Sequence, residues 1–169
     1  MTEFSEQSKS ARLIILCGKI CSGKSTYAKK LSEEGNYVVL SSDELMIPLE
    51  KYLCGDYDDA LAVFIDFFRR KAVEIVRAGA GVIFDFGAWT RADREKVKRF
   101  FSENCISYEM HYLKVSDKVW DQHIRSRNQA VKDGKCLAYY VDDGLRAKAL
   151  ELFEEPEPWE YDVLIEIAK

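Results

Sequence analysis

One short stretch has the residue types and spacing to bind a phosphate group: Gly18-Lys19-Ile20-Cys21-Ser22-Gly23-Lys24-Ser25-Thr26. Two glycines five positions apart precede a lysine and a hydroxyl residue, which is the Walker A pattern. The glycines can adopt backbone angles closed to other residues, so successive N–H groups can turn inward on an anion. Lys24 supplies a cation for the β- and γ-phosphates of a nucleotide, and the Ser25 hydroxyl can ligate Mg²⁺.

The sequence on both sides of this loop predicts the elements that would position it. Residues 12–17 form an apolar run typical of a buried strand, and residues 25–31 are typical of a helix. The first turn of such a helix directs its free N–H groups at a phosphate. The residues that we predict to contact a nucleotide from the loop are Gly18, Lys19, Cys21, Ser22, Gly23, Lys24, Ser25 and Thr26.

Two aspartates follow further predicted strands, at residues 37–41 and 81–87. Ligands of open α/β sheets bind at the carboxyl ends of the strands, where Asp43 and Asp85 would lie. Asp43 begins a predicted helix, where it could accept a proton from a substrate hydroxyl or act as a plain helix cap. Asp85 ends a buried strand, where an unpaired carboxylate is costly. A contact with magnesium-bound water, with substrate or with Ser25 would explain it.

The basic residues divide into two groups. Arg125 and Arg127 lie on a predicted helix at 119–130 that leads into a lid, where an arginine could stabilise a phosphoryl group in transfer. Because they are two residues apart they point to different faces, and we favour Arg127. Arg91 and Arg94 follow the third strand and could hold an anionic substrate, or they could be solvated helix charges.

The remaining pattern predicts a parallel α/β sheet, because strands alternate with helices along the chain. The other strands are expected at residues 106–115 and 161–167, and the other helices at 58–78, 90–102 and 142–153. Residues 44–56 are expected to be irregular, since Pro48 and Gly55 interrupt them. We expect a loose tail at residues 1–10 and a single domain at 11–169, with a lid at roughly 125–141.

The composition of the chain limits the classes of protein to which it can belong. The chain has 169 residues, a net charge of −4 and a pI near 5.4, which argues against a broad basic surface for nucleic acid but leaves room for a local basic groove. Five scattered cysteines without a C-x-x-C pair are typical of reduced thiols in a cytoplasmic protein. No apolar segment suggests a signal peptide or a membrane span.

Several motifs in order resemble those of small P-loop kinases, a group of AAA-type ATP-binding proteins. They are the phosphate loop, Ser42-Asp43-Glu44, Phe84-Asp85-Phe86 followed by Thr90-Arg91-x-x-Arg94-Glu95, and Arg125-x-Arg127-Asn128. Within the group, the chain resembles those allied to polynucleotide 5′-hydroxyl kinase, zeta toxin and chloramphenicol phosphotransferase. The chain departs from several of them after Asn128, where a second lid arginine is missing.

The resemblance implies a three-layer α/β/α P-loop NTPase fold with a five-stranded parallel sheet in the order 2-3-1-4-5 and a small helical lid. It also implies a catalytic aspartate at Asp43 and a lid arginine on the ATP phosphates at Arg127, with Arg125 as the alternative. Lys24 would act on the transferring phosphoryl, Ser25 and Asp85 would bind Mg²⁺, and Asp85, Arg91 and Arg94 would join Asp43 around the acceptor.

We therefore predict an ATP- and Mg²⁺-dependent kinase that phosphorylates a hydroxyl of a small-molecule or nucleotide-like acceptor. A polynucleotide 5′-hydroxyl kinase is the alternative within the same enzyme class. A regulatory ATPase or a toxin-like protein without a small acceptor is the alternative outside it. A GTPase switch is disfavoured, because the sequence has no N-K-x-D motif for guanine.

Overall fold

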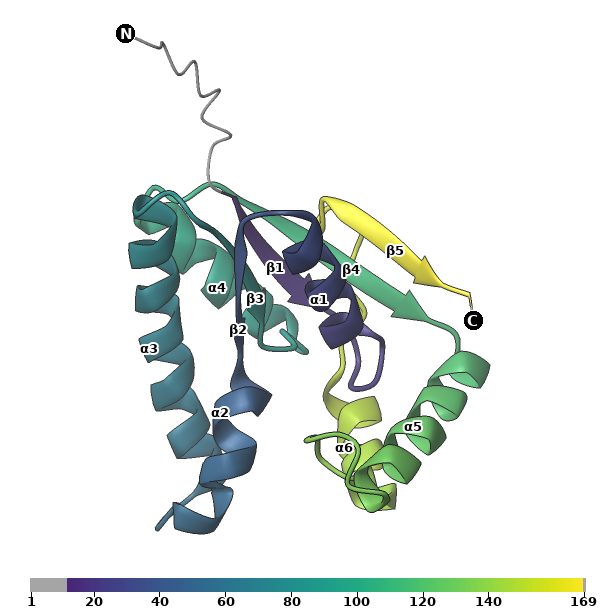
Figure 1. The fold of residues 1–169 in the computed structure, drawn as a ribbon. Coiled ribbons are helices and arrows are strands. Elements are labelled where there is room, and N and C mark those ends of the chain that lie inside the picture. Colours follow the sequence, from purple (N-terminus) through teal and green to yellow (C-terminus); the bar gives the residue numbers. More distant parts are fainter. Residues whose placement is uncertain (1–11, 169) are drawn as a thin grey trace, which may run out of the picture.

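The computed structural model describes residues 12–168 and contains one sheet of five parallel strands in the order β2-β3-β1-β4-β5 (Figure 1). The strands are β1 (Leu13–Cys17), β2 (Tyr37–Ser41), β3 (Gly81–Asp85), β4 (Tyr108–Val115) and β5 (Val163–Ile167). Both the parallel arrangement and the strand order agree with the prediction. The strands are apolar on both faces where both faces are covered, as in β1, in which every residue is buried.

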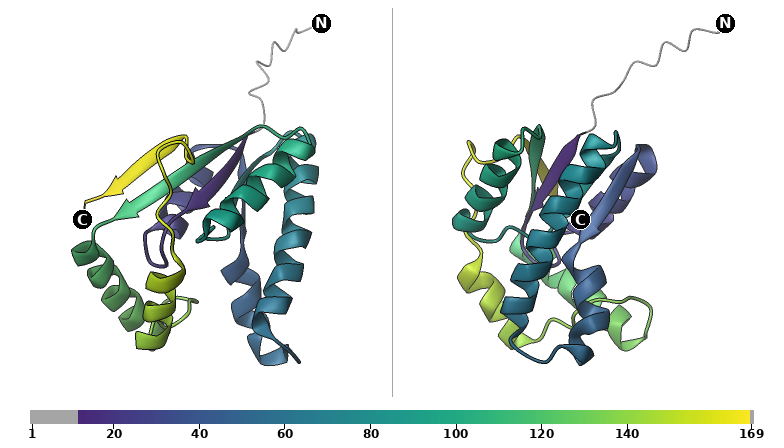
Figure 2. Two further views of the ribbon diagram at one scale, coloured as in Figure 1. Left: turned by 180° about the vertical axis from the view of Figure 1, so that it is seen from behind. Right: turned by 90° about the vertical axis from the view of Figure 1, so that its left-hand side faces the viewer.

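Helices cover both faces of this sheet, which gives three layers (Figure 2). On one face lies α1 (Lys24–Glu34), and on the other lie α3 (Tyr57–Arg77) and α4 (Arg91–Glu103). Beyond the carboxyl ends of the strands lie α2 (Ser42–Leu49), the short 3₁₀ helix η1 (Glu50–Tyr52), α5 (Asp117–Lys132) and α6 (Asp143–Leu152) (Figure 1). None of the helices within residues 12–168 combines the length and apolar character that crossing a membrane requires.

The register of the strands places the candidate site residues together at the carboxyl ends of β1, β2 and β3. Ser41, the last residue of β2, pairs with Asp85, the last residue of β3. β3 in turn pairs with β1, which leads directly into the phosphate loop. The ends of three neighbouring parallel strands therefore place the loop, Asp85 and the start of α2 side by side.

Two expectations about regular structure were wrong. Part of the segment expected to be irregular forms α2, with Pro48 inside it. Pro48 lies in the last turn of the helix, where its missing N–H removes a bond without breaking the turns before it. The strand expected from residue 106 begins at Tyr108, and it lies inside the sheet between β1 and β5, with residues 110–113 buried. The expected tail at residues 1–10 falls outside the described residues.

Arg94 is one of the largest fully buried side chains of the protein, at 1% exposed. Its guanidinium donates to both carboxylate oxygens of Glu160, at 2.9 and 3.2 Å, and to the backbone carbonyls of Glu154 and Trp89, at 2.8 and 3.2 Å. The hydrogen bond from Arg94 holds the pKa of the Glu160 carboxyl below its ordinary value. The expectation that Arg94 binds substrate or is a solvated charge was therefore wrong. It joins α4 to the segment before β5.

Replacing Arg94 with methionine should destabilise the protein by about 3–5 kcal/mol, because Glu160 would remain buried without its partner. The free energy of unfolding, measured by urea titration, tests this. Arg91→Met is the matched control: Arg91 begins the same helix with its side chain 58% exposed, so the change should stay within about 0.5 kcal/mol. Equal losses in the two variants would contradict the anchoring role.

Candidate active site

The phosphate loop between β1 and α1 has the backbone geometry of an anion-binding turn. Gly18, Cys21 and Gly23 all have positive φ angles, of 155°, 59° and 97°. At Gly18 an added Cβ would lie 2.6 Å from Ser22 Oγ and 2.9 Å from a backbone carbonyl, so only glycine fits. Cys21 holds its positive φ despite having a side chain, a strained conformation that occurs mainly at functional sites.

The outward-facing carbonyls of this loop are taken by protein donors. Lys24 Nζ donates to the carbonyls of residues 18 and 19, at 2.9 and 2.8 Å. From α5, Trp120 Nε1 donates to the carbonyl of Ile20 at 2.6 Å, and His123 Nδ1 lies 3.0 Å from that of Cys21. His123 therefore supports the loop backbone. The carbonyls of residues 18–21 therefore all accept hydrogen bonds within the protein, and those of Ile20 and Cys21 would keep theirs when Lys24 turns to a phosphate.

Ser25 and Asp85 meet beside the loop, where the Ser25 hydroxyl donates to Asp85 Oδ2 at 3.3 Å. Asp85 is 7% exposed, and burial raises the pKa of its carboxyl, while the charge of Lys24 opposes that shift. The two groups are hard oxygen donors of the kind that Mg²⁺ prefers. Within residues 12–168 no cluster of three or more His, Cys, Asp or Glu residues could hold a metal. A pair of oxygens beside a phosphate loop nevertheless suits Mg²⁺, which takes its other ligands from phosphates and water.

Asp43 and Arg127 approach each other across the open side of the loop. Arg127 Nη2 lies 3.9 Å from Asp43 Oδ2, and Arg127 Nη1 donates to Cys21 Sγ at 3.4 Å. Asp43 is the second residue of α2, whose N-cap is Ser41, so Asp43 is not the helix cap. Arg125 is exposed on another face of α5, as the spacing predicts.

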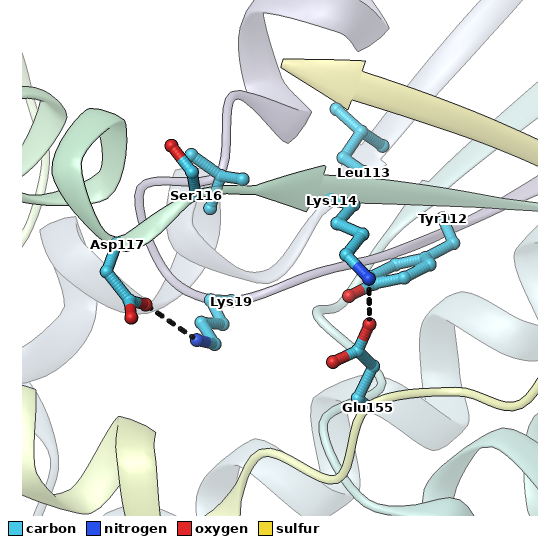
Figure 3. Close-up of a pocket in the computed structure, with 8 residues that line it drawn as sticks. Lys19, Tyr112, Leu113, Lys114, Ser116, Asp117 and Glu155 are labelled. Atoms are coloured by element: carbon cyan, nitrogen blue, oxygen red, sulfur yellow. Dashed lines mark hydrogen bonds and ion pairs between the residues drawn. The ribbon is translucent and has the colours of Figure 1, made fainter. Parts of the chain in front are cut away.

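The remaining predicted residues lie elsewhere. The Lys19 side chain turns toward Asp117, at 3.8 Å, and lines a cavity of about 320 Å³ with Tyr112, Lys114 and Glu155 (Figure 3). The charges in that cavity are paired with each other, including Lys114 with Glu155 at 2.6 Å. Arg91 is exposed and bonded to Glu95 at 3.0 Å.

Sequence reasoning missed two side chains that shape the site. Asn128 accepts from the backbone N–H of Val141 and donates to its carbonyl, both at 2.8 Å, and so fixes the end of the loop at 133–142 to α5. Trp120 ties the first turns of α5 to the phosphate loop. Asn128 follows Arg127 directly, but only the fold reveals that its partner is a backbone 13 residues away.

A family model described as an AAA domain matches residues 13–139, three quarters of the chain. The chain belongs to this family. No curated protein matches the sequence. The phosphate loop, Asp43, Asp85 and Arg127 all fall within the AAA domain match.

Several solved structures with a similar fold are described as kinases. A sugar kinase from Janibacter sp. HTCC2649 has a TM-score of 0.64 at 16% identity, over 92% of this chain and 85% of that chain. The APS kinase CysC of Mycobacterium tuberculosis, in complex with AMPPNP and APS, has a TM-score of 0.65 at 16% identity, over 95% and 90%. A chain of the Pnkp1/Rnl/Hen1 RNA repair complex has a TM-score of 0.65 at 15% identity, over 89% and 46%. At these identities the likeness establishes the fold alone, a three-layer α/β/α P-loop NTPase fold.

Asp85→Asn should stabilise the ligand-free protein, because it removes a charge that burial disfavours while keeping an oxygen for Ser25. Each kcal/mol gained would raise Tm by about 2–4 °C for a chain of this size. The same variant should lose most of the further Tm increase that MgATP gives the unmodified protein. Thermal melts with and without MgATP measure both effects, with Asp66→Asn as control, since the Asp66 side chain is 51% exposed. A lower Tm without ligand would contradict this account of Asp85.

Proposed function

We propose that the protein transfers the γ-phosphoryl group of ATP to a hydroxyl of a small-molecule or nucleotide-like acceptor, with Mg²⁺. The observation that carries this proposal is the approach of Asp43 to Arg127 over the phosphate loop, at 3.9 Å. A carboxylate that can take a proton and a cation that can stabilise phosphoryl charge thus lie on the same side of the loop. A site that only bound a nucleotide would need the cation without the carboxylate.

The loop and its neighbours would hold the nucleotide. Backbone N–H groups of the loop that make no bond within the protein, together with the first turn of α1, would bind the β- and γ-phosphates, and Lys24 would leave its carbonyl partners to reach them, while the Ser22 N–H stays bonded to the Lys19 carbonyl at 3.1 Å. Ser25 and Asp85 would hold Mg²⁺, which when bound neutralises charge on the phosphate oxygens. Arg127 has a side chain 19% exposed, so its charge would act on the phosphoryl with little screening by water.

Asp43 would act on the acceptor. Its side chain is half exposed, which leaves room for a hydroxyl to bind beside it. As the acceptor oxygen bonds to the γ-phosphorus, the bond to the β-phosphate oxygen breaks and ADP leaves. The acceptor proton passes to Asp43, which balances the reaction. The loop at 133–142, fixed by Asn128, would act as the lid that excludes water.

The cellular location is part of the proposal. All five cysteines are free, at positions 17, 21, 54, 105 and 136, which suits a reducing compartment such as the cytoplasm.

The test of the reaction is ADP release from MgATP across a panel of hydroxyl compounds: nucleosides, 5′-hydroxyl oligonucleotides, sugars, aminoglycosides and amino alcohols. Lys24→Ala provides the blank, since it removes the phosphate-binding cation. A rise that depends on acceptor and vanishes in the blank is the expected result. ATP binding with no response to any acceptor would favour a regulatory ATPase.

Asp43→Asn should lower kcat at least about 100-fold, the usual loss when a general base is removed, and change the Kd for MgATP little. The matched control is Glu44→Gln, which removes a neighbouring exposed charge from the same turn and should keep kcat within about threefold. Steady-state kinetics and nucleotide titration separate the two effects. If kcat were unchanged, Asp43 would be only a partner of Arg127.

A further inference from the structure

Two tyrosines from different parts of the chain meet beside the candidate site. Tyr57 is the first residue of α3, and Tyr139 lies in the loop between α5 and α6. Their hydroxyl groups are 3.0 Å apart and hydrogen-bonded, and their rings stand nearly perpendicular, at 81°, with centroids 6.2 Å apart. Both side chains are only partly buried. They form an aromatic corner between the acceptor side and the lid.

The charges of two carboxylates, Asp43 and Glu50, act on both phenols of this corner. Burial is the main cause that raises the pKa of both phenols, and the charges of Asp43 and Glu50 raise it further. The two phenols therefore stay neutral near pH 7, with negative charge close to their rings. Lys148 of α6 lies 3.9 Å from Asp58 of α3, so α6 as well as the lid loop meets the start of α3.

Residues 43–59, which would form the acceptor side of the site, are acidic as a whole. Residues 43–59 contain six carboxylates and one lysine. The carboxylates are Asp43, Glu44, Glu50, Asp56, Asp58 and Asp59; Asp43 lies 3.9 Å from Arg127 and Asp58 lies 3.9 Å from Lys148, which leaves an excess of negative charge on the segment. The single lysine, Lys51, lies over the ring of Tyr52, 4.8 Å from its centroid. On the lid, Lys135 is paired with Asp133 at 2.9 Å, so its charge is largely offset. Arg94, expected to attract an anion, is buried in its own ion pair.

We propose that the aromatic corner of Tyr57 and Tyr139 binds an ammonium group of the acceptor, so that the substrate is an amine-bearing alcohol. This rests on the proposed phosphoryl transfer and names its substrate class. Aromatic faces attract cations, and quaternary ammonium ligands are commonly recognised by such rings. Asp43 and Glu50 add opposite charge beside the same corner. An anionic acceptor, such as an oligonucleotide or a sugar acid, would meet repulsion there.

The proposal is tested on the full chain bound to Mg²⁺ and AMPPNP, with choline and its uncharged carbon isostere 3,3-dimethylbutan-1-ol as probes. These two alcohols have nearly the same shape and differ in charge. The ring signals of ¹³C-labelled tyrosine report binding by NMR. We expect choline to bind about tenfold more tightly than the isostere, a size typical of a cation on aromatic faces, and to shift the signals of both tyrosines.

Substitutions of the tyrosines test where choline binds. Tyr57→Leu and Tyr139→Leu should each remove most of the preference for choline. Tyr57→Phe and Tyr139→Phe keep the rings, lose only the hydroxyl pair and should keep the preference within about threefold, since the attraction comes from the ring face. Tyr52→Leu is the matched control, because Tyr52 is 68% exposed on the same segment and should have no effect.

Equal Kd values for choline and its isostere in the unmodified protein would overturn the proposal without relying on any variant. So would a choline preference that survives both leucine variants. Assays of ADP release distinguish a failure of this proposal from a failure of the proposed phosphoryl transfer. Lys24-dependent turnover that prefers anionic acceptors would overturn the substrate class and keep the kinase. Choline binding at the corner without turnover of any acceptor would overturn the kinase and keep the ammonium site.

Discussion

The structure depends on a backbone that must turn its N–H groups toward an anion and still satisfy its carbonyls. In the phosphate loop this requires positive φ angles, and it sends the carbonyls of residues 18–21 outward. Lys24, Trp120 and His123 supply donors to them. The last two come from α5, so the helix that completes the loop is also the helix that carries Arg127. Loop geometry and the position of the arginine are therefore coupled through one rigid element.

A second constraint fixes the turn at the carboxyl end of β3. The guanidinium of Arg94 needs several acceptors once it is buried, and it finds them in Glu160, in the carbonyl of Trp89 five residues before it and in the carbonyl of Glu154, 60 residues after it. Some of these carbonyls belong to the turn after β3, where Ala88 has a positive φ of 45°. That turn directly follows Asp85. A buried ion pair far from the phosphate thus helps to fix the backbone that carries a candidate metal ligand.

Sequence reasoning identified features that are local or periodic. The phosphate loop is contiguous, and parallel strands bring their carboxyl ends together by topology alone, so Asp43 and Asp85 could be placed beside it before any coordinates. Arg94 could not, because a buried arginine on an amphipathic helix has the same spacing as a solvated one, and its partner is 66 residues away. The Tyr57–Tyr139 pair, 82 residues apart, had no periodic signal either. Such pairings arise from tertiary packing, and the propensity and spacing of residues report only on local structure.

In the proposed reaction, the charges of the site would divide along the path of the phosphoryl group. Lys24 and Arg127 would lie on the nucleotide side, where phosphates must be neutralised, while the α2–α3 side carries carboxylates and neutral phenols. An acceptor that itself carried negative charge would have to be matched by cations on its own side, and the two candidates, Arg91 and Arg94, are bonded to glutamates. The fold fixes where the phosphate is held, whereas the side chains of α2, α3 and the lid determine which hydroxyl can approach it.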